Sequence, residues 1–380
     1  MTSIEEYLRN RIIEVMISQG FSVNPHLKPK GMKKRQKDAI KKIHALKRKE
    51  KLKQHREFLL ENLKEVESCS ISGKELKIKN IELKLKEVKT GTFESKLFLW
   101  WNLVWWSLPY ERSVGRQMKF IIWDTYHGAP FGLIGLQSPP LKSRVRDEFL
   151  GINKKDLDYW INQSMYAQRV GALPPYNNLL GGKMVALSLV SNELRMAYAR
   201  KYKNKKTIIR RRVIPNRLLF IATTSAYGKS SMYERLVFKG EPVSLFIGYT
   251  SGCGTFHLPE DLYREILRYL EQKGVDTKRG IETGPSRKLR LVHLAFKKLK
   301  IPNFIFHNIK RGYYIFPNVR NLHDVIQKNE KPEWYDRRFH ELHEYWLNRW
   351  CIPRSKRKDE WRFFDKNRFF RKIRLQLTKL

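Results

Sequence analysis

Apolar positions recur at helical spacing through the first seventy residues. Four of them lie between Ser3, a typical N-cap, and Gly20, a typical helix end: Leu8, Ile12, Ile13 and Met16. Six more follow at helical spacing: Ile40, Ile43, Leu46, Leu59, Leu63 and Val66. We therefore predict a short amphipathic helix and then a long helix with a narrow buried stripe.

Between about residues 75 and 325 the pattern changes to short apolar runs bounded by turn residues. "LKIKNIELKLKEV" alternates apolar and polar residues, while "QMKFIIWD", "FGLIGLQ" and "RLLFIATT" are continuous apolar runs typical of buried strands. Helical patterns alternate with them in "GGKMVALSLVSNELRMAYARKY" and "PEDLYREILRYLEQKG". These patterns predict an α/β (α+β) layer structure built on a mixed sheet.

Composition divides the chain into three regions, which we expect to be a helical basic N-terminal region (1–72), an α/β core (73–325) and a basic aromatic C-terminal tail (326–380). From Tyr345 to Leu380 there are twelve Lys or Arg and three acidic residues, interleaved with aromatic residues. Such interleaving suits a polyanion with stackable bases. We expect the tail to add binding affinity, and residues 353–380 to be dispensable for folding.

Charge narrows the choice of partner. The 380-residue chain has 77 Lys and Arg against 37 Asp and Glu, a net charge of +40, yet its 41% hydrophobic residues are enough for a real core. From Lys30 to Arg56 there are thirteen basic and two acidic residues, too unbalanced for a helix of paired charges, although a merely solvated helix is the alternative. Nucleic acid is the predicted partner, with DNA preferred to RNA.

Other classes of protein are disfavoured by the sequence. No apolar run approaches the roughly 20 residues that a membrane-spanning helix needs, and no signal-peptide pattern precedes the first helix. Cys69, Cys253 and Cys351 lie far apart without CxxC spacing, so we predict neither a disulfide framework nor a metal site. We expect a cytoplasmic, nucleoid-associated protein that does not bind membranes.

The stretch "PPYNNLLGGKMVAL" places two glycines and a lysine at a helix start. The first N–H groups of a helix lack partners within it, and glycines let a phosphate approach them closely. Gly181, Gly182 and Lys183 are therefore our candidates for binding a cofactor or another phosphate. The alternative is that the glycines only permit close packing of helix against sheet.

Candidate catalytic residues come from two other stretches. In "TTSAYGKSSMYERL", Ser230 beside a lysine is a candidate nucleophile and Tyr233 a candidate general acid, whereas a helix-capping serine is the alternative. In "RVRDEF", Asp147 is a candidate base, unless the arginines beside it neutralise it as an ion pair. Cys253 and His257 form a weaker candidate pair for catalysis or half a metal site.

Basic residues near glycines, on the positive helix face and in the tail are our candidates for contacts with nucleic-acid phosphates. They are Lys33, Lys34, Arg35, Lys41, Lys47, Arg48, Lys229, Arg235, Lys278, Arg279, Arg287, Lys310, Arg311, Arg357 and Arg362.

The order of elements in the middle region resembles the core of the GNAT acyltransferase fold. The series is strand "MKFIIWD", strand "FGLIGLQ", strand "MYAQRVGAL", helix "LLGGKMVALSLV", strand "RLLFIATT", short helix "SSMYERLVF" and strand "VSLFIGYT". The resemblance implies that the glycine-led helix binds the pyrophosphate of a cofactor and that Tyr233 protonates a thiolate leaving group. Coenzyme A and a nucleic-acid phosphate are equal claimants for that helix start, so the cofactor stays open.

A second resemblance runs through most of the chain. Six ordered blocks are similar to those of the DruA family of the Druantia anti-phage system: "WWSLPYERSVGRQMKFIIWD", "GLIGLQSPPLKSRVRDEFLGI", "PPYNNLLGGKMVAL", "TTSAYGKSSMYERL", "YTSGCGTFHLP" and "HNIKRGYYIFPNVRN". This resemblance implies an association with bacterial or phage mobile DNA and with defence, without fixing a reaction. We expect a DNA-binding protein that modifies or processes DNA in phage defence or a mobile element, with other proteins of that system or element as partners. A non-catalytic nucleic-acid-binding subunit and an RNA or ribonucleoprotein component are the alternatives.

Overall fold

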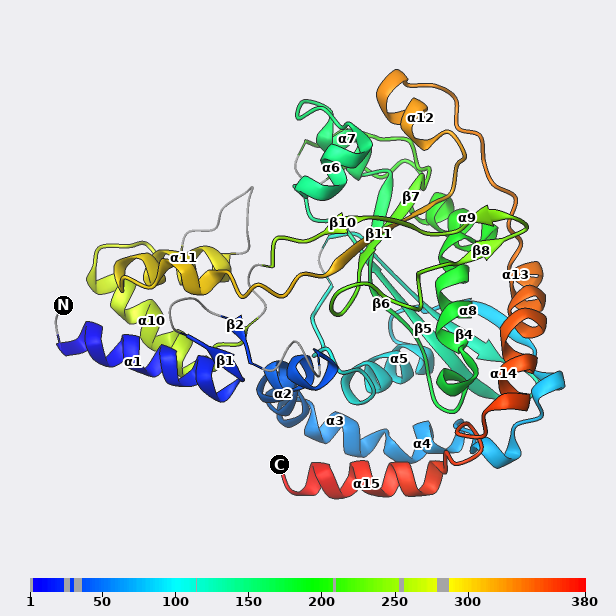
Figure 1. The fold of residues 1–380 in the computed structure, drawn as a ribbon, viewed down its shortest axis with the longest axis horizontal. Coiled ribbons are helices and arrows are strands. Elements are labelled where there is room, and N and C mark those ends of the chain that lie inside the picture. The colour runs from blue at the N-terminus through cyan, green and yellow to red at the C-terminus, as the bar shows by residue number, and fades with distance from the viewer. Residues whose placement is uncertain are drawn as a thin grey trace.

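A computed structural model of the chain describes residues 3–23, 28–30, 36–113, 115–207, 210–252, 256–278 and 287–380. Its centre is a seven-stranded sheet in the order β10-β11-β7-β6-β5-β4-β3 (Figure 1). The strands are β3 (Leu83–Glu87), β4 (Gln117–Asp124), β5 (Ala129–Gln137), β6 (Ser164–Ala172), β7 (Phe220–Thr224), β10 (Leu245–Tyr249) and β11 (Gly312–Pro317). Two small sheets pair β1 (Phe21–Ser22) with β2 (Lys28–Pro29) and β8 (Val237–Phe238) with β9 (Glu241–Pro242). The predicted mixed α/β layer structure is confirmed, while its likeness to GNAT enzymes stays a prediction.

One parallel pair interrupts the otherwise antiparallel central sheet. Strands β6 and β7 run parallel and pair over only three positions, the last of which joins Tyr166 to Ala222. Beyond Tyr166, β6 continues to Ala172 along β5, while Thr223 and Thr224 of β7 pair with β11. The two central strands therefore part at their carboxyl ends, which is where ligand sites of α/β sheets lie.

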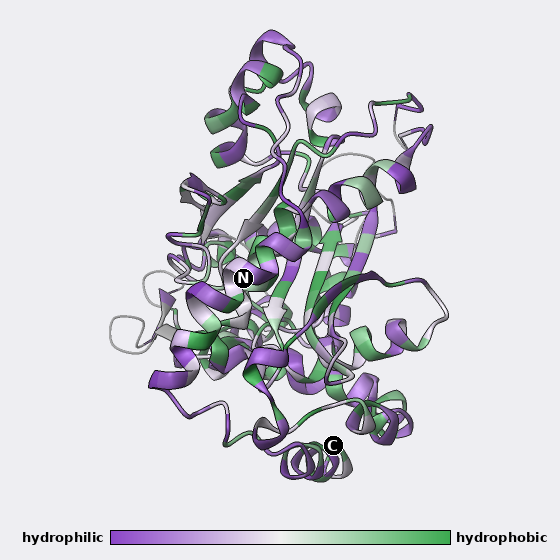
Figure 2. Cartoon of the chain, turned by 90° about the vertical axis from the view of Figure 1, so that its right-hand side faces the viewer, coloured by the Kyte–Doolittle hydropathy of each residue, from purple (hydrophilic) through white to green (hydrophobic). Residues whose placement is uncertain are grey.

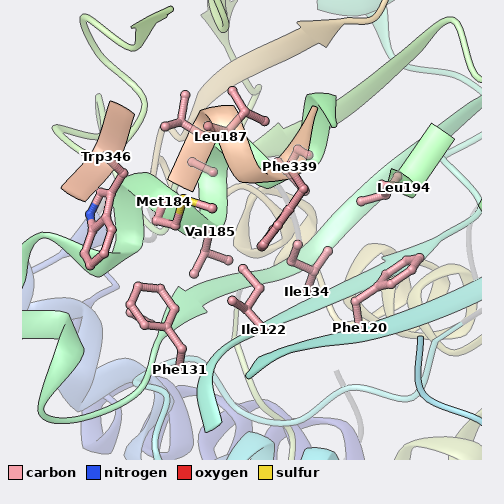
Figure 3. Packing of buried hydrophobic residues seen from close by; sticks show 14 of the residues in the cluster. Phe120, Ile122, Phe131, Ile134, Met184, Val185, Leu187, Leu194, Phe339 and Trp346 are labelled. Atoms are coloured by element: carbon pink, nitrogen blue, oxygen red, sulfur yellow. The ribbon is translucent and has the colours of Figure 1, made fainter. Parts of the chain in front are cut away.

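One face of the sheet is covered by α8 (Gly181–Leu187), α9 (Asn192–Tyr202) and α13 (Phe339–Trp346). Figure 3 shows the strand residues Phe120, Ile122, Phe131 and Ile134 packed against apolar side chains of α8 and α13. A π-helical turn (Leu347–Cys351) continues α13 into α14 (Ile352–Arg357). The short 3-10 helices of the chain are η1 (Gly73–Glu75), η2 (Ile78–Asn80), η3 (Tyr176–Leu179), η4 (Ser188–Val190) and η5 (Pro302–Ile305).

The opposite face is covered by α3 (Arg56–Glu61), α4 (Leu63–Ser68), α5 (Phe93–Val104) and the C-terminal helix α15 (Lys366–Thr378). The rings of Phe370 and Trp100 lie 5.2 Å apart, and Phe369 stacks on Trp101 at 5.6 Å. Phe370 is fully buried. The expectation that residues 353–380 are dispensable for folding is therefore wrong, because Trp361 and Phe370 of this segment are buried in the core.

Two further apolar clusters lie at the ends of the molecule. Helix α1 (Ser3–Ser18) packs with α10 (Glu260–Gln272) and α11 (Arg287–Lys298), so the first helix joins a segment some 250 residues away in sequence. Helix α2 (Gln36–Gln54) links this lobe to the rest (Figure 1). Helices α6 (Arg144–Leu150), α7 (Leu157–Ile161) and α12 (Leu322–Lys328) pack around β7 and β11. The boundaries at 72 and 325 stay a prediction.

Several local predictions can be compared with the structure. The first helix ends before Gly20, which has a φ of +92°, and the long helix forms as α2, α3 and α4 with breaks at His55 and Asn62. The predicted short helix in "SSMYERLVF" is wrong, because residues 231–235 form turns. Apolar residues concentrate on the central strands, and much of the outer helices is hydrophilic (Figure 2). Within the described ranges, none of the helices has the length and apolar character needed to cross a bilayer.

Candidate functional site

The glycine-led helix α8 begins directly after Leu180, which has a φ of +58°. A Cβ added to Gly181 would lie 2.7 Å from the carbonyl oxygen of Tyr176, and one added to Gly182 would lie 2.8 Å from the Sδ of Met232. Gly181 is therefore required where the start of the helix packs against the backbone, whereas a side chain at Gly182 would need only the flexible Met232 side chain to move. Close packing, the alternative reading of this stretch, accounts for Gly181, and phosphate binding by the two glycines stays a prediction.

Lys183 is occupied by contacts inside the protein. Its Nζ donates to the carbonyl oxygens of Ser231 (3.2 Å) and Glu234 (3.4 Å) and lies 5.3 Å from the centre of the Trp350 ring. Burial lowers the pKa of this amine. Lys183 lines a surface hollow of about 800 Å³ together with Arg235, so both predicted residues reach one basic surface.

The three candidate catalytic residues do not meet in a cavity. The Tyr233 ring packs edge-on against Tyr314 and Phe316, and burial raises the pKa of its hydroxyl well above the ordinary value. The Ser230 backbone N–H donates to the Tyr314 hydroxyl at 2.9 Å. Neither the hollow at Lys183 nor the cavity described next is lined by Tyr233, Ser230 or Asp147. Their catalytic roles stay predictions.

Asp147 is engaged by its neighbours, as the ion-pair alternative supposes. Its carboxylate accepts the Ser143 backbone N–H at 2.8 Å and pairs with the guanidinium of Arg146 at 2.6 Å. Arg146 is fully buried and also donates to the carbonyl oxygens of Pro140 and Leu141. This carboxylate therefore neutralises a buried cation that ties α6 to the preceding loop.

The structure brings a different set of residues together where β6 and β7 part. A cavity of about 430 Å³ lies there, lined by segments from seven parts of the chain. Its walls are His44, Lys47, Leu108, Pro109, Glu111, Arg112, Gln137, Tyr166, Ala167, Gln168, Arg169, Thr224, Phe256, His257 and Arg311. The carboxyl ends of two parallel strands thus open into a small polar chamber.

The buried Arg169 and the partly buried Arg311 dominate this cavity. Arg169 on β6 is 5% exposed, lies 5.1 Å from the centre of the Trp106 ring and donates from Nη2 to the Pro109 carbonyl oxygen at 3.5 Å. Arg311 is held through its backbone, which exchanges hydrogen bonds with Thr250. Burial lowers the pKa of both guanidinium groups, that of Arg169 to about 10. Among the described residues, the Nε of each is buried without a hydrogen-bond partner.

The neighbouring charged groups leave this cavity positive. Glu111 is paired with Lys47, so Arg112, Arg169 and Arg311 remain against no other carboxylate of the lining. Burial, and then the charge of Arg311, lowers the pKa of His44 to about 3, which keeps its imidazole neutral. Burial likewise lowers the pKa of His257, whose Nε2 lies 2.7 Å from the Glu50 carboxylate. An anion entering the cavity therefore meets an excess of cationic donors.

The rest of the cavity wall has a polar part and an apolar part. The Tyr166 hydroxyl and the Thr224 hydroxyl are 2.7 Å apart, and the Gln168 amide donates to the Ser113 hydroxyl. Leu108, Pro109 and Phe256 supply apolar surface. Cavities with apolar walls and a few converging polar groups are the usual form of small-ligand sites.

The predicted nucleic-acid contacts fall into three groups. Lys47 and Arg311 line the cavity, and Arg48 lies close by, donating to the Val104 carbonyl oxygen at 3.2 Å. Exposed on the surface are Lys41, Lys229, Arg235, Lys278, Arg287, Lys310, Arg357 and Arg362. Outside the described residues lie Lys33, Lys34, Arg35 and Arg279, together with Cys253.

Reasoning from the sequence missed the most buried cation of the cavity. Arg169 interrupts the strand "MYAQRVGAL", and a charged residue within an apolar strand is a signal that the sequence alone offered. His44 carried no such signal, because it lies among many basic residues. In the part of the chain that the structure covers, no three His, Cys, Asp or Glu side chains gather as a metal site would require.

Comparison with known proteins shows the family of this chain. The family model described as Druantia protein DruA matches residues 34–328. A curated relative from Escherichia coli (strain UMEA 4076-1), named Druantia protein DruA, is 34% identical over 268 residues. That match covers 70% of this chain and 65% of the relative. No solved structure matches the chain. The matched segment includes every one of the cavity-lining residues, and the chain belongs to the Druantia protein DruA family.

Proposed function

We propose that this protein acts in Druantia anti-phage defence as a DNA-binding protein, and that the cavity between β6 and β7 binds a phosphate group of its nucleic acid. Its cytoplasmic, nucleoid-associated location and its association with other proteins of the defence system belong to the same proposal. Family membership supports the role in defence. The choice of nucleic acid as the ligand rests on the charge and the cavity.

The observation that carries the proposal is that the buried Arg169 and the partly buried Arg311 line the same cavity. Burying a cation without a compensating partner costs several kcal/mol, so proteins rarely keep one for stability alone. Arg169 and Arg311 share one small cavity, and each has a buried Nε that the described residues leave unpaired. Guanidinium groups bind phosphate oxygens through paired N–H donors, so a phosphate would satisfy both.

The surface charge supports the same ligand. The chain has a net charge of +40, and eight of the predicted phosphate contacts are exposed. Exposed Lys and Arg neutralise DNA phosphates and release their counterions, giving affinity that is independent of sequence and sensitive to salt. The exposed residues would hold the nucleic-acid backbone while the cavity receives one group of it.

A second candidate is group transfer on the nucleic acid with an acyl cofactor. One observation favours it. The cavity lies where β6 and β7, the fourth and fifth strands of the central sheet in chain order, part from each other, and the glycine-led helix α8 follows β6. The GNAT resemblance supposes such a helix after the fourth strand. Tyr233 lies in the core outside this cavity, so a proton donor for such a reaction would have to come from Tyr166 or from solvent.

Fluorescence anisotropy with labelled DNA tests the leading proposal. For six or more neutralised phosphates we expect affinity to fall on the order of a thousandfold between about 50 and 200 mM salt. Binding to DNA should also exceed binding to an RNA of the same sequence. A salt-independent affinity, or no binding to DNA at low salt, would contradict the proposal.

A further inference from the structure

We infer that the cavity binds a single unpaired nucleotide, with its phosphate on Arg169 and Arg311 and its base against the apolar and amide-bearing walls. This inference rests on the proposed function and deepens it by naming the ligand of the cavity. A strand with an unpaired nucleotide and a free mononucleotide share this chemistry.

The size of the cavity excludes a duplex. At about 430 Å³ it lies within the range of roughly 300 to 1,000 Å³ that is typical of small-ligand sites. Proteins read a duplex by entering its grooves, the wider of which is about 12 Å across, so a duplex contacts convex protein surface. A nucleotide at a strand end or turned out of the stack is the part of DNA that enters a chamber of this size.

The phosphate end of the ligand is defined by the two arginines. Arg169 comes from the middle of β6 and Arg311 from the residue before β11, so the sheet fixes both side chains at their bases. Both arginines line the cavity, and the Nε of each, like the Nε2 of His44 beside them, is buried without a partner among the residues described here. A phosphate held by the two guanidinium groups gains strong charge-assisted hydrogen bonds.

The base end of the ligand is defined by the remaining walls. Leu108 and Phe256 offer apolar and aromatic surface on which a base packs, as bases do in proteins that bind single strands. The Gln168 amide, one N–H of which donates to the Ser113 hydroxyl, carries a donor and an acceptor of the kind that pair with base edges. Inorganic phosphate would use only the cationic side, so this arrangement predicts a preference for a nucleotide.

Isothermal titration calorimetry tests the inference with the full chain. Deoxyadenosine 5′-monophosphate, deoxyadenosine and inorganic phosphate are the probes, and a single-stranded 12-mer and a closed duplex without ends compete with the monophosphate. We expect one monophosphate per chain, at least tenfold weaker binding of deoxyadenosine and of phosphate, and competition by the 12-mer alone. Competition by the 12-mer assigns the site to strands, and its absence assigns the site to free nucleotides.

Matched variants locate the binding. Arg169→Met and Arg311→Met should each weaken the monophosphate at least tenfold, while Arg144→Met, which removes an exposed arginine outside the cavity, should change it less than twofold. Unchanged binding in both cavity variants overturns the inference, and so does phosphate binding as tightly as the monophosphate. If salt-sensitive DNA binding persists while the monophosphate fails to bind, the inference falls and the proposed function stands. Loss of both overturns both.

Discussion

Replacing Arg169 with methionine should make the protein more stable while it weakens nucleotide binding. Arg169 is 5% exposed, and burial lowers the pKa of its guanidinium to about 10. The folded chain thus holds this proton more weakly than the unfolded chain does. The resulting cost is present in full below pH 10, including at pH 7, and is relieved only as the pH rises above 10. A residue kept for stability would not carry such a cost.

The size of the expected gain follows from this pKa. A value of about 10, against the usual value for arginine, corresponds to roughly 3 kcal/mol of destabilisation of the charged form. Methionine keeps the packing of the stem but loses the hydrogen bond to Pro109 and the contact with the Trp106 ring, together worth about 1 kcal/mol. At an unfolding entropy of about 2.1 cal/mol/K per residue, the net gain of about 2 kcal/mol raises Tm by about 2–3 °C.

Differential scanning calorimetry at pH 7, without ligand, measures this change in Tm. Arg144→Met serves as the control, because the side chain of Arg144 is largely exposed and pairs with Glu148 on its own helix. We expect its Tm to stay within about 1 °C of that of the parent, since exposed ion pairs contribute little. A fall of more than about 2 °C in the Tm of Arg169→Met would contradict this prediction, because Arg169 would then stabilise the fold.

Three further predictions concern the core, the pH response and the glycine-led helix. Deleting residues 366–380 should lower Tm by more than about 5 °C in a thermal melt. Phe370 and Leu377 are buried, and large core side chains contribute about 3–5 kcal/mol each. An unchanged Tm would show that this segment is dispensable for folding. Since burial lowers the pKa of His44 from 6.5 to about 3, the unfolded chain binds the extra proton as the pH falls below 6.5, and stability should drop by about 2 kcal/mol at pH 5. Urea titrations at pH 7 and 5 should show a smaller drop in His44→Gln, and an equal drop would exclude His44 as its source. Lys183→Met should change DNA affinity less than twofold, because its Nζ already donates to two carbonyl groups; a tenfold loss would instead support the anion site predicted from the sequence.

The local pattern of apolar and polar residues predicted most of the fold, because buried strands and helices have apolar residues at their buried positions. "QMKFIIWD" and "FGLIGLQ" are β4 and β5 nearly residue for residue, since both are buried and bounded by turn residues. "SSMYERLVF" misled because its apolar residues also fit helical spacing. In the folded chain Tyr233 packs on Phe316 of β11, and tertiary contacts of this kind override local propensity.

The cavity could not be predicted from the local sequence pattern, for a different reason. Its walls come from segments between His44 and Arg311 that meet only because β6 and β7 run parallel and then part. The spacing of residues along the sequence does not show where β6 and β7 separate. Lys47 and Arg311, two of the predicted phosphate contacts, line the cavity, but nothing in the sequence distinguished these two from the many exposed lysines and arginines. Only the folded chain places Arg169 and Arg311 in one cavity.

Photochemical crosslinking can show whether a nucleotide occupies the cavity, because it reports which residues touch the base. A single strand with one 5-iododeoxyuridine at its end is irradiated with the full chain, and the crosslinked peptide is identified by mass spectrometry. We expect the crosslink at Phe256 or Tyr166, the aromatic residues of the cavity, and we expect Arg169→Met to suppress it while Arg144→Met does not. Crosslinks confined to exposed residues such as Phe363, and unaffected by Arg169→Met, would contradict a nucleotide site in the cavity.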